Sequence, residues 1–187
     1  MTTPRIPRSR ALCLAPVAAL VLLAGCAAAP VNAPQELLDE ATGTTLTRLV
    51  APVELTSIEP RGANADPFAY LAPFETNRMG ERRLYLWLAI PDEQKSGAVP
   101  VLQIDGERLE VGAPLPDVRA AGLARWPYAD PAPWSAVHVF EVDAAQLAAL
   151  ARASELRLSE AGRGLAFAAR LQRPSVIAEF SGRLGLD

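Results

Sequence analysis

Hydrophobic and polar positions alternate along much of this chain with the two-residue period that is typical of half-buried β-strands. The alternation is clearest in three segments, 44–58, 84–90 and 135–142. In the second segment both faces are apolar, with Leu84, Leu86, Leu88 and Ile90 on one and Tyr85, Trp87 and Ala89 on the other. A strand that is apolar on both faces is covered on both sides. We therefore predict that 84–90 is a central strand.

Turn-forming residues separate these strand patterns. Pro52 either breaks the first segment in two or confines it to a sheet edge. Residues 77–80 predict a turn between two strands, because asparagine and glycine tolerate the left-handed backbone. The strongest hairpin signal is Asp105-Gly106, which lies between alternating flanks. A further hairpin is predicted around residues 160–164.

The helical period of 3.6 residues is much rarer. One clear helix is predicted at about 143–153, where Asp143 can cap the first turn and Leu147 and Leu150 share a face. The tail 173–184 fits a helix or a strand, and we favour the helix. Residues 35–43 predict a single helical turn that Gly43 ends.

Together these patterns predict a mainly β protein, an antiparallel β-sandwich or open barrel of about eight strands with one clear helix. Strands and helices do not alternate along the chain as they do in parallel nucleotide-binding sheets. We therefore expect no fold of that kind.

The first residues follow a different pattern. Three arginines, Arg5, Arg8 and Arg10, precede an uncharged run of about fifteen residues, shorter than the ~20 apolar residues of a membrane span. The run ends in Leu23-Ala24-Gly25-Cys26, which resembles a bacterial lipobox, the cleavage and lipidation signal of lipoprotein precursors. A buried core helix and ordinary signal cleavage after a later alanine are the alternatives.

The resemblance implies three regions: a signal peptide at 1–25, a flexible tether at 26–34 and a single domain at 35–187. It also implies that Cys26 receives a diacylglycerol and, after cleavage, an N-terminal acyl chain such as palmitate. Ala27 stands where aspartate would retain such a protein at the inner membrane. The expected location is thus the outer membrane, lipid-anchored, with the domain facing the periplasm. Beyond this signal, the domain resembles only uncharacterised proteobacterial lipoproteins.

Composition limits the chemistry. Loss of the three leader arginines would change the net charge from −3 to about −6, which does not favour nucleic-acid binding. Cys13 would leave with the signal and Cys26 would be lipidated, so we expect neither disulfides nor thiolate metal sites. With His138 as the only histidine, we predict no metal and no cofactor.

The residues also give little indication of catalysis. His138 shares its strand parity with apolar residues, and no G-x-S-x-G turn is present. The carboxylates of segments 92–93 and 105–110 lie in predicted turns, without the spacing of a calcium loop. We therefore assign no catalytic residue and do not expect an enzyme.

The most unusual segment is 124–134, where Trp126, Tyr128 and Trp134 alternate with three prolines. Rigid prolines and large aromatic rings are typical of a recognition loop. A lid over the open end of the sandwich explains the same residues, and we favour the lid, keeping the three rings as a candidate binding loop.

The leading functional hypothesis is a non-enzymatic binding or structural module of the cell envelope, whose partner is an envelope protein or a glycan. The alternatives are a periplasmic carrier of an apolar small ligand or lipid, and a hydrolase of an envelope polymer.

Overall fold

The computed structural model describes residues 33–58, 67–92, 97–160, 165–172 and 175–186. The predicted signal peptide, Cys26 and nearly all of the predicted tether lie outside these ranges, as do residues 161–164 of the predicted last hairpin. Within the described residues, ten strands form one antiparallel sheet and two α-helices pack against it. The strands are β1 (Gln35–Asp39), β2 (Thr44–Arg48), β3 (Val53–Ser57), β4 (Phe68–Arg78), β5 (Glu81–Pro91), β6 (Pro100–Ile104), β7 (Glu107–Arg108), β8 (Ser135–Val142), β9 (Glu155–Glu160) and β10 (Leu165–Arg170).

The centre of the sheet is β5, which pairs with β4 on one side and with β8 on the other. Its two apolar faces contribute to two separate cores, as the sequence predicts. Leu86, Leu88 and Ile90 belong to the larger core, whereas Tyr85, Trp87 and Ala89 belong to the smaller one. The central position of 84–90 is thus confirmed.

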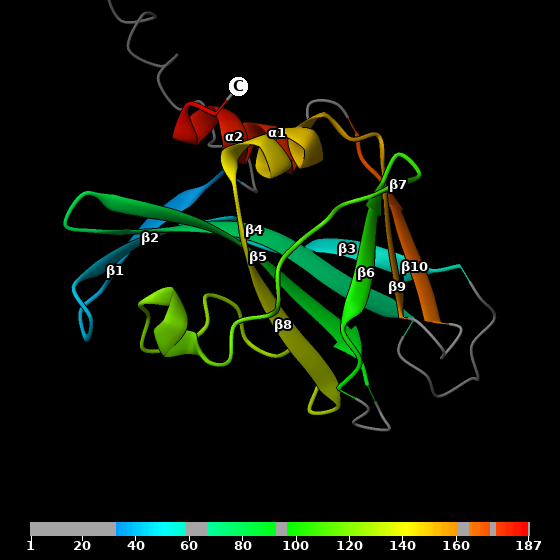
Figure 1. Ribbon diagram of the computed structural model, residues 1–187, viewed down its shortest axis with the longest axis horizontal. Coiled ribbons are helices and arrows are strands. Elements are labelled where there is room, and N and C mark those ends of the chain that lie inside the picture. Colours follow the sequence, from blue (N-terminus) through cyan, green and yellow to red (C-terminus); the bar gives the residue numbers. More distant parts are fainter. Residues whose placement is uncertain (1–32, 59–66, 93–96, 161–164, 173–174, 187) are drawn as a thin grey trace, which may run out of the picture. The chain divides into compact units, whose positions relative to one another are not determined.

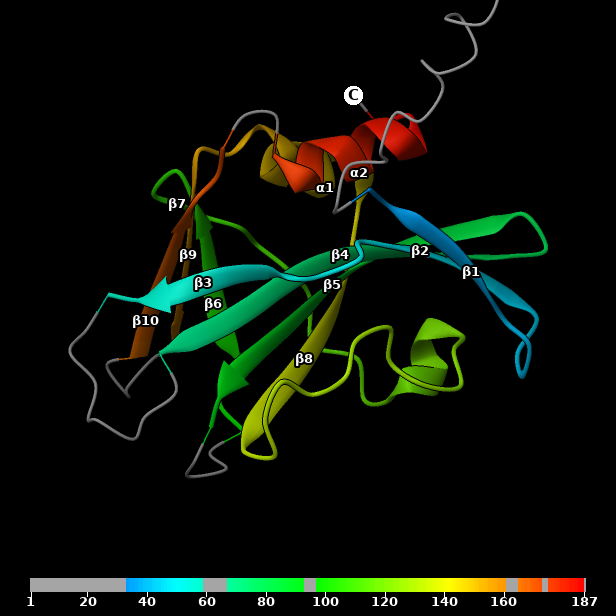
Figure 2. The same ribbon diagram turned by 180° about the vertical axis from the view of Figure 1, so that it is seen from behind.

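Pro52 divides the first strand pattern into β2 and β3. Both pair with the same edge of β4, β2 opposite residues 74–77 and β3 opposite residues 68–71. From β3 the sheet continues through β10 and β9 to β6 and β7. Figures 1 and 2 show β6, β9 and β10 turned away from β4 and β5.

This bend encloses the larger core. Leucines of β3, β4, β5, β6 and β9 meet there with Phe140 of β8 and Phe167 of β10. The strand order does not close on itself. The predicted class, a mainly β antiparallel sandwich or open barrel, is confirmed, with ten strands rather than about eight.

The two helices, α1 (Ala144–Arg152) and α2 (Val176–Leu184), lie side by side over this core (Figures 1 and 2). Asp143 caps α1 as predicted: its carboxylate accepts from the Gln146 N–H at 2.7 Å, and the Gln146 side chain accepts from the Asp143 N–H. Ser175 caps α2, so the helical interpretation of the tail is confirmed. Leu147, Leu150, Ile177 and Phe180 point into the core.

The helical turn predicted for residues 35–43 is wrong. Residues 35–39 form β1, which pairs with β2 from Gln35–Arg48 to Asp39–Thr44. Backbone hydrogen bonds along β2 hold this segment as a strand. This tertiary pairing outweighs the local preference of the segment for a helical turn. Gly43 does serve a turn: its positive φ of 67° lets its N–H donate to the Asp39 carbonyl.

The predicted turns at 77–80 and 105–106 are confirmed. Asp105 and Gly106 both have positive φ, in the hairpin of β6 and β7. In the other turn the positive-φ residues are Met79 and Gly80, and Asn77 contributes through its side chain, which accepts from the Gly80 N–H.

The long connection between β7 and β8 covers the face of β4 and β5 that is turned away from the larger core (Figures 1 and 2). It includes the short 3-10 helix η2 (Val118–Ala121). Leu123 and Tyr128 of this connection complete the smaller core with Phe74, Tyr85 and Trp87. No helix in the described part of the chain is long and apolar enough to cross a membrane.

Candidate functional site

An open groove lies between the β1–β2 hairpin and residues 123–127 of the long connection. Its volume is about 750 Å³, within the range of ligand sites in proteins. The residues that line it include Leu37, Leu38, Asp39, Arg48, Arg125 and Trp126. We call this groove the β1 groove.

Apolar side chains are exposed on its β1 wall. Leu37 is 42% exposed and Leu38 is 63% exposed, although both are large aliphatic residues. Trp126 lies on the opposite wall, half-buried, and packs against the smaller core. Successive side chains of a strand alternate between its faces, and Leu37 shares the face of Asp39, whose carboxylate accepts from the Ala124 N–H across the groove. An exposed leucine and a partly buried tryptophan that border one groove are a feature of binding surfaces.

Asp39 joins the two walls. Its carboxylate accepts from the Ala124 N–H at 2.7 Å and from the Ala41 N–H at 3.1 Å. These bonds favour the charged form, the bond from Ala124 most, and hold the pKa of Asp39 below its usual value. The contact fixes the end of β1 against the long connection and so sets the width of the groove.

Arg48 and Tyr128 support the base of the groove. The Arg48 guanidinium donates to the Pro127 carbonyl and lies over the Tyr128 ring, 5.2 Å from its centroid. The Tyr128 hydroxyl donates to the Leu49 carbonyl at 3.2 Å, and the ring packs against Trp87. Burial raises the pKa of Tyr128 far above its usual value, so this hydroxyl stays a donor.

The structure separates the three rings of the candidate binding loop. Tyr128 is buried and serves as a lid over the smaller core, whereas Trp126 borders the β1 groove. Trp134 is 45% exposed and lines a different hollow with Asp92 and Ser135. The two tryptophans therefore do not contribute to one surface.

His138 is buried on β8 beside Phe140, as its parity predicts. Burial lowers the pKa of His138, and the buried carboxylates Glu160 and Asp92 partly oppose this shift. Its Nε2 atom has no hydrogen-bond partner among the described residues.

Sequence reasoning did not identify the β1 wall of the groove. The sequence pattern predicts a helical turn for Leu37 and Leu38, whereas both residues lie on an edge strand. Asp39 and Arg125 carry no motif, and they reach the groove only because β1 lies beside residues 123–127 in the fold. The leucine pair beside an acidic residue, directly after the predicted tether, was the available signal.

Comparison of the chain with protein-family models, with curated proteins and with solved structures gives no match. Within the described ranges, no three histidine, cysteine, aspartate or glutamate side chains are placed so that they could hold a metal ion.

Proposed function

We propose that this chain is a non-enzymatic outer-membrane lipoprotein and that its periplasm-facing β domain binds another envelope protein through the β1 groove. The anchoring part of the proposal rests on Leu23-Ala24-Gly25-Cys26 and the basic, apolar leader before it. The binding part rests on one observation: the exposed Leu37 of an edge strand and Trp126 of the long connection line the same open groove.

An extended polypeptide is the occupant that the groove favours. Within the described residues β1 pairs only with β2, so its other edge presents free backbone donors and acceptors. A partner strand can pair with such an edge while its side chains enter the adjacent groove. Leu37 and Trp126 would contact apolar side chains of that strand.

The charges on the walls favour a polypeptide over an apolar small ligand. Asp39, Glu40, Arg48 and Arg125 all line the groove. Asp39 and Arg48 have hydrogen-bond partners within the fold, but an apolar cargo would remove the charges of Glu40 and Arg125 from water without compensation, which is costly. A peptide can supply opposite charges and backbone hydrogen bonds at the same positions.

Photo-crosslinking in intact cells tests the proposal. A photoreactive residue at position 37 is expected to form an adduct with a partner, whereas the same residue at exposed position 58 is not. Trp126→Ala is expected to reduce the adduct several-fold, because a tryptophan at a binding site contributes a large contact area. Trp134→Ala is the matched control, since it removes an exposed tryptophan from a different hollow.

The adduct is then digested with a protease or with a muramidase. Sensitivity to the protease alone supports a protein partner, and conversion by the muramidase shows that the partner is a glycan and overturns the assignment. If the Trp126→Ala and Trp134→Ala variants gave the same yield of adduct, the β1 groove would not be the binding site.

A further inference from the structure

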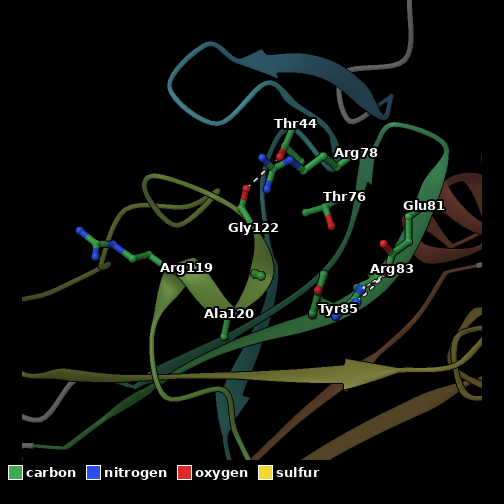
Figure 3. Close-up of a pocket in the computed structure, with 10 residues that line it drawn as sticks. Thr44, Thr76, Arg78, Glu81, Arg83, Tyr85, Arg119, Ala120 and Gly122 are labelled. Carbon is green, nitrogen blue, oxygen red and sulfur yellow. Dashed lines mark hydrogen bonds and ion pairs between the residues drawn. The ribbon is translucent and has the colours of Figure 1, made fainter.

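A second hollow, of about 160 Å³, lies near the tip of the β4–β5 hairpin and is lined by three arginines. Arg78 comes from β4, Arg83 from β5 and Arg119 from η2. Thr76 and Tyr85 line it as well (Figure 3). We call this hollow the arginine pocket.

The arginines on the two faces of the β4–β5 hairpin differ in their ion pairs. On the face toward α2, Arg82 is neutralised by Glu75 through two hydrogen bonds of 2.7 and 2.9 Å and also donates to the Leu184 carbonyl. On the opposite face only Arg83 has an acidic partner, Glu81, at 2.6 Å. The side chains of Arg78 and Arg119 form no ion pair within the described part of the chain.

Hydrogen-bond donors therefore exceed acceptors in this pocket. Tyr85 is only 1% exposed, yet its hydroxyl has no hydrogen-bond partner of normal geometry among the described residues. Figure 3 shows this hydroxyl directed toward Thr76, with the Arg83 side chain beside it. Burial raises the pKa of Tyr85; the Thr76 and Arg83 side chains beside the hydroxyl partly oppose this rise, and Glu141 on the neighbouring strand adds to it.

A buried donor without an acceptor costs free energy, and the Tyr85 hydroxyl and the Arg78 guanidinium, unpaired among the described residues, suit a ligand rich in acceptor oxygens. The chain as a whole is acidic, with a formal net charge of −3, whereas the pocket is lined by three arginines and one glutamate, Glu81, which pairs with Arg83. Guanidinium groups match the geometry of phosphate oxygens. Arg78 and Arg83 belong to paired strands, β4 and β5, and both line the pocket.

We propose that the arginine pocket binds a phosphate group, with Arg78 and Arg83 as its charged ligands and the Tyr85 hydroxyl as a third donor. Arg119 lies at the rim, and Figure 3 shows its side chain directed away from Thr76 and Tyr85. The phosphate can be free inorganic phosphate or the diester of a lipid headgroup or envelope polymer. This site is separate from the β1 groove and does not depend on the function proposed for it.

Calorimetric titration of the full chain in a non-ionic detergent tests the proposal, with inorganic phosphate, dimethyl phosphate and acetate at matched ionic strength. Saturable binding of one or both phosphates is expected, and acetate is expected to bind weakly. Binding of inorganic phosphate only indicates the free ion, and binding of dimethyl phosphate indicates a diester. Equal binding of acetate and phosphate would overturn the assignment of the ligand class.

Variants distinguish phosphate binding in the arginine pocket from a general effect of salt on the protein. Arg78→Gln is expected to weaken phosphate binding about tenfold, as loss of a charge-assisted hydrogen bond does. Arg108→Gln is the matched control, because it removes an exposed arginine from β7. Tyr85→Phe is expected to weaken binding several-fold while leaving the unliganded chain at least as stable. The proposal is overturned if Arg108→Gln weakens binding as much as Arg78→Gln, or if neither phosphate binds saturably.

Discussion

Five side chains in the described part of the chain have a buried polar atom without a hydrogen-bond partner: Thr42, Arg48, Tyr85, Trp87 and His138. Two of them, Arg48 and Tyr85, line hollows that we propose as binding sites. Trp87 lies in the smaller core beneath Tyr128, and His138 lies beside Phe140 of the larger core. Such atoms reduce stability, and the variants at Tyr85 and His138 have defined expected effects.

His138 is expected to make the stability of the domain depend on pH. Burial lowers its pKa in the folded state below the ordinary value of 6.5, so the unfolded chain binds the proton more readily. The free energy of unfolding is therefore complete above about pH 6.5 and falls as the pH decreases toward the folded-state pKa. Urea unfolding at about pH 7.5 and about pH 5.5 measures this loss.

The His138→Gln variant cannot titrate in this range and is expected to lose less stability over the same interval. Glu160 and Asp92 raise the pKa of His138, whereas burial lowers it. The change of the free energy of unfolding with pH therefore measures the balance of these two effects. Identical pH dependence in the variant and the unchanged chain would contradict a buried, neutral His138.

At the scale of elements, α1 gives a direct test of a sequence prediction. The carboxylate of Asp143 satisfies the Gln146 N–H, and the Gln146 side chain satisfies the Asp143 N–H. Asp143→Ala removes half of this reciprocal cap and is expected to lower the free energy of unfolding by about 1 kcal/mol. Asp143→Asn keeps an acceptor oxygen and is expected to stay close to the unchanged chain. Thermal or urea unfolding that shows no difference between the two variants would mean that the cap contributes nothing.

Elements with strong local signals could be predicted from the sequence. The capped helix at 143–153, the Asp105-Gly106 turn and the break at Pro52 all depend on residues that are adjacent in the chain, and all are confirmed. The β1 strand could not be predicted in this way. Residues 35–39 have no alternating pattern, and all but Asp39 are exposed, so only their pairing with β2 makes them a strand.

The candidate sites required the whole fold. The β1 groove brings residues 37–48 beside residues 123–127, and the arginine pocket brings β4 and β5 beside η2. No spacing in the sequence links these segments. Of the three aromatic rings of the predicted loop, Trp126 alone lines the groove, because Tyr128 turns inward and Trp134 lies at another hollow.

The proposed anchor has its own test at the scale of the whole molecule. Mass spectrometry of the protein purified from membranes is expected to show a chain that begins at Cys26 and carries a diacylglycerol and an N-terminal acyl group. The nine residues 26–34 can span at most about 30 Å, so the β1 groove would stay close to the membrane surface. A Cys26→Ala variant is the control and is expected to lack the lipid mass. An unmodified Cys26 in the unchanged chain would refute the anchor.

The pairing of β3 with β10 has a consequence for the order of folding. It joins residues 56 and 57 to residues 167 and 168, so the sheet remains incomplete until the last strand has been synthesised. Contacts between distant parts of a chain slow folding, because the intervening loop must close first. If the chain is exported as proposed, early strands would lack their final neighbour until the C-terminal residues emerge, and this delay would keep the chain unfolded during export.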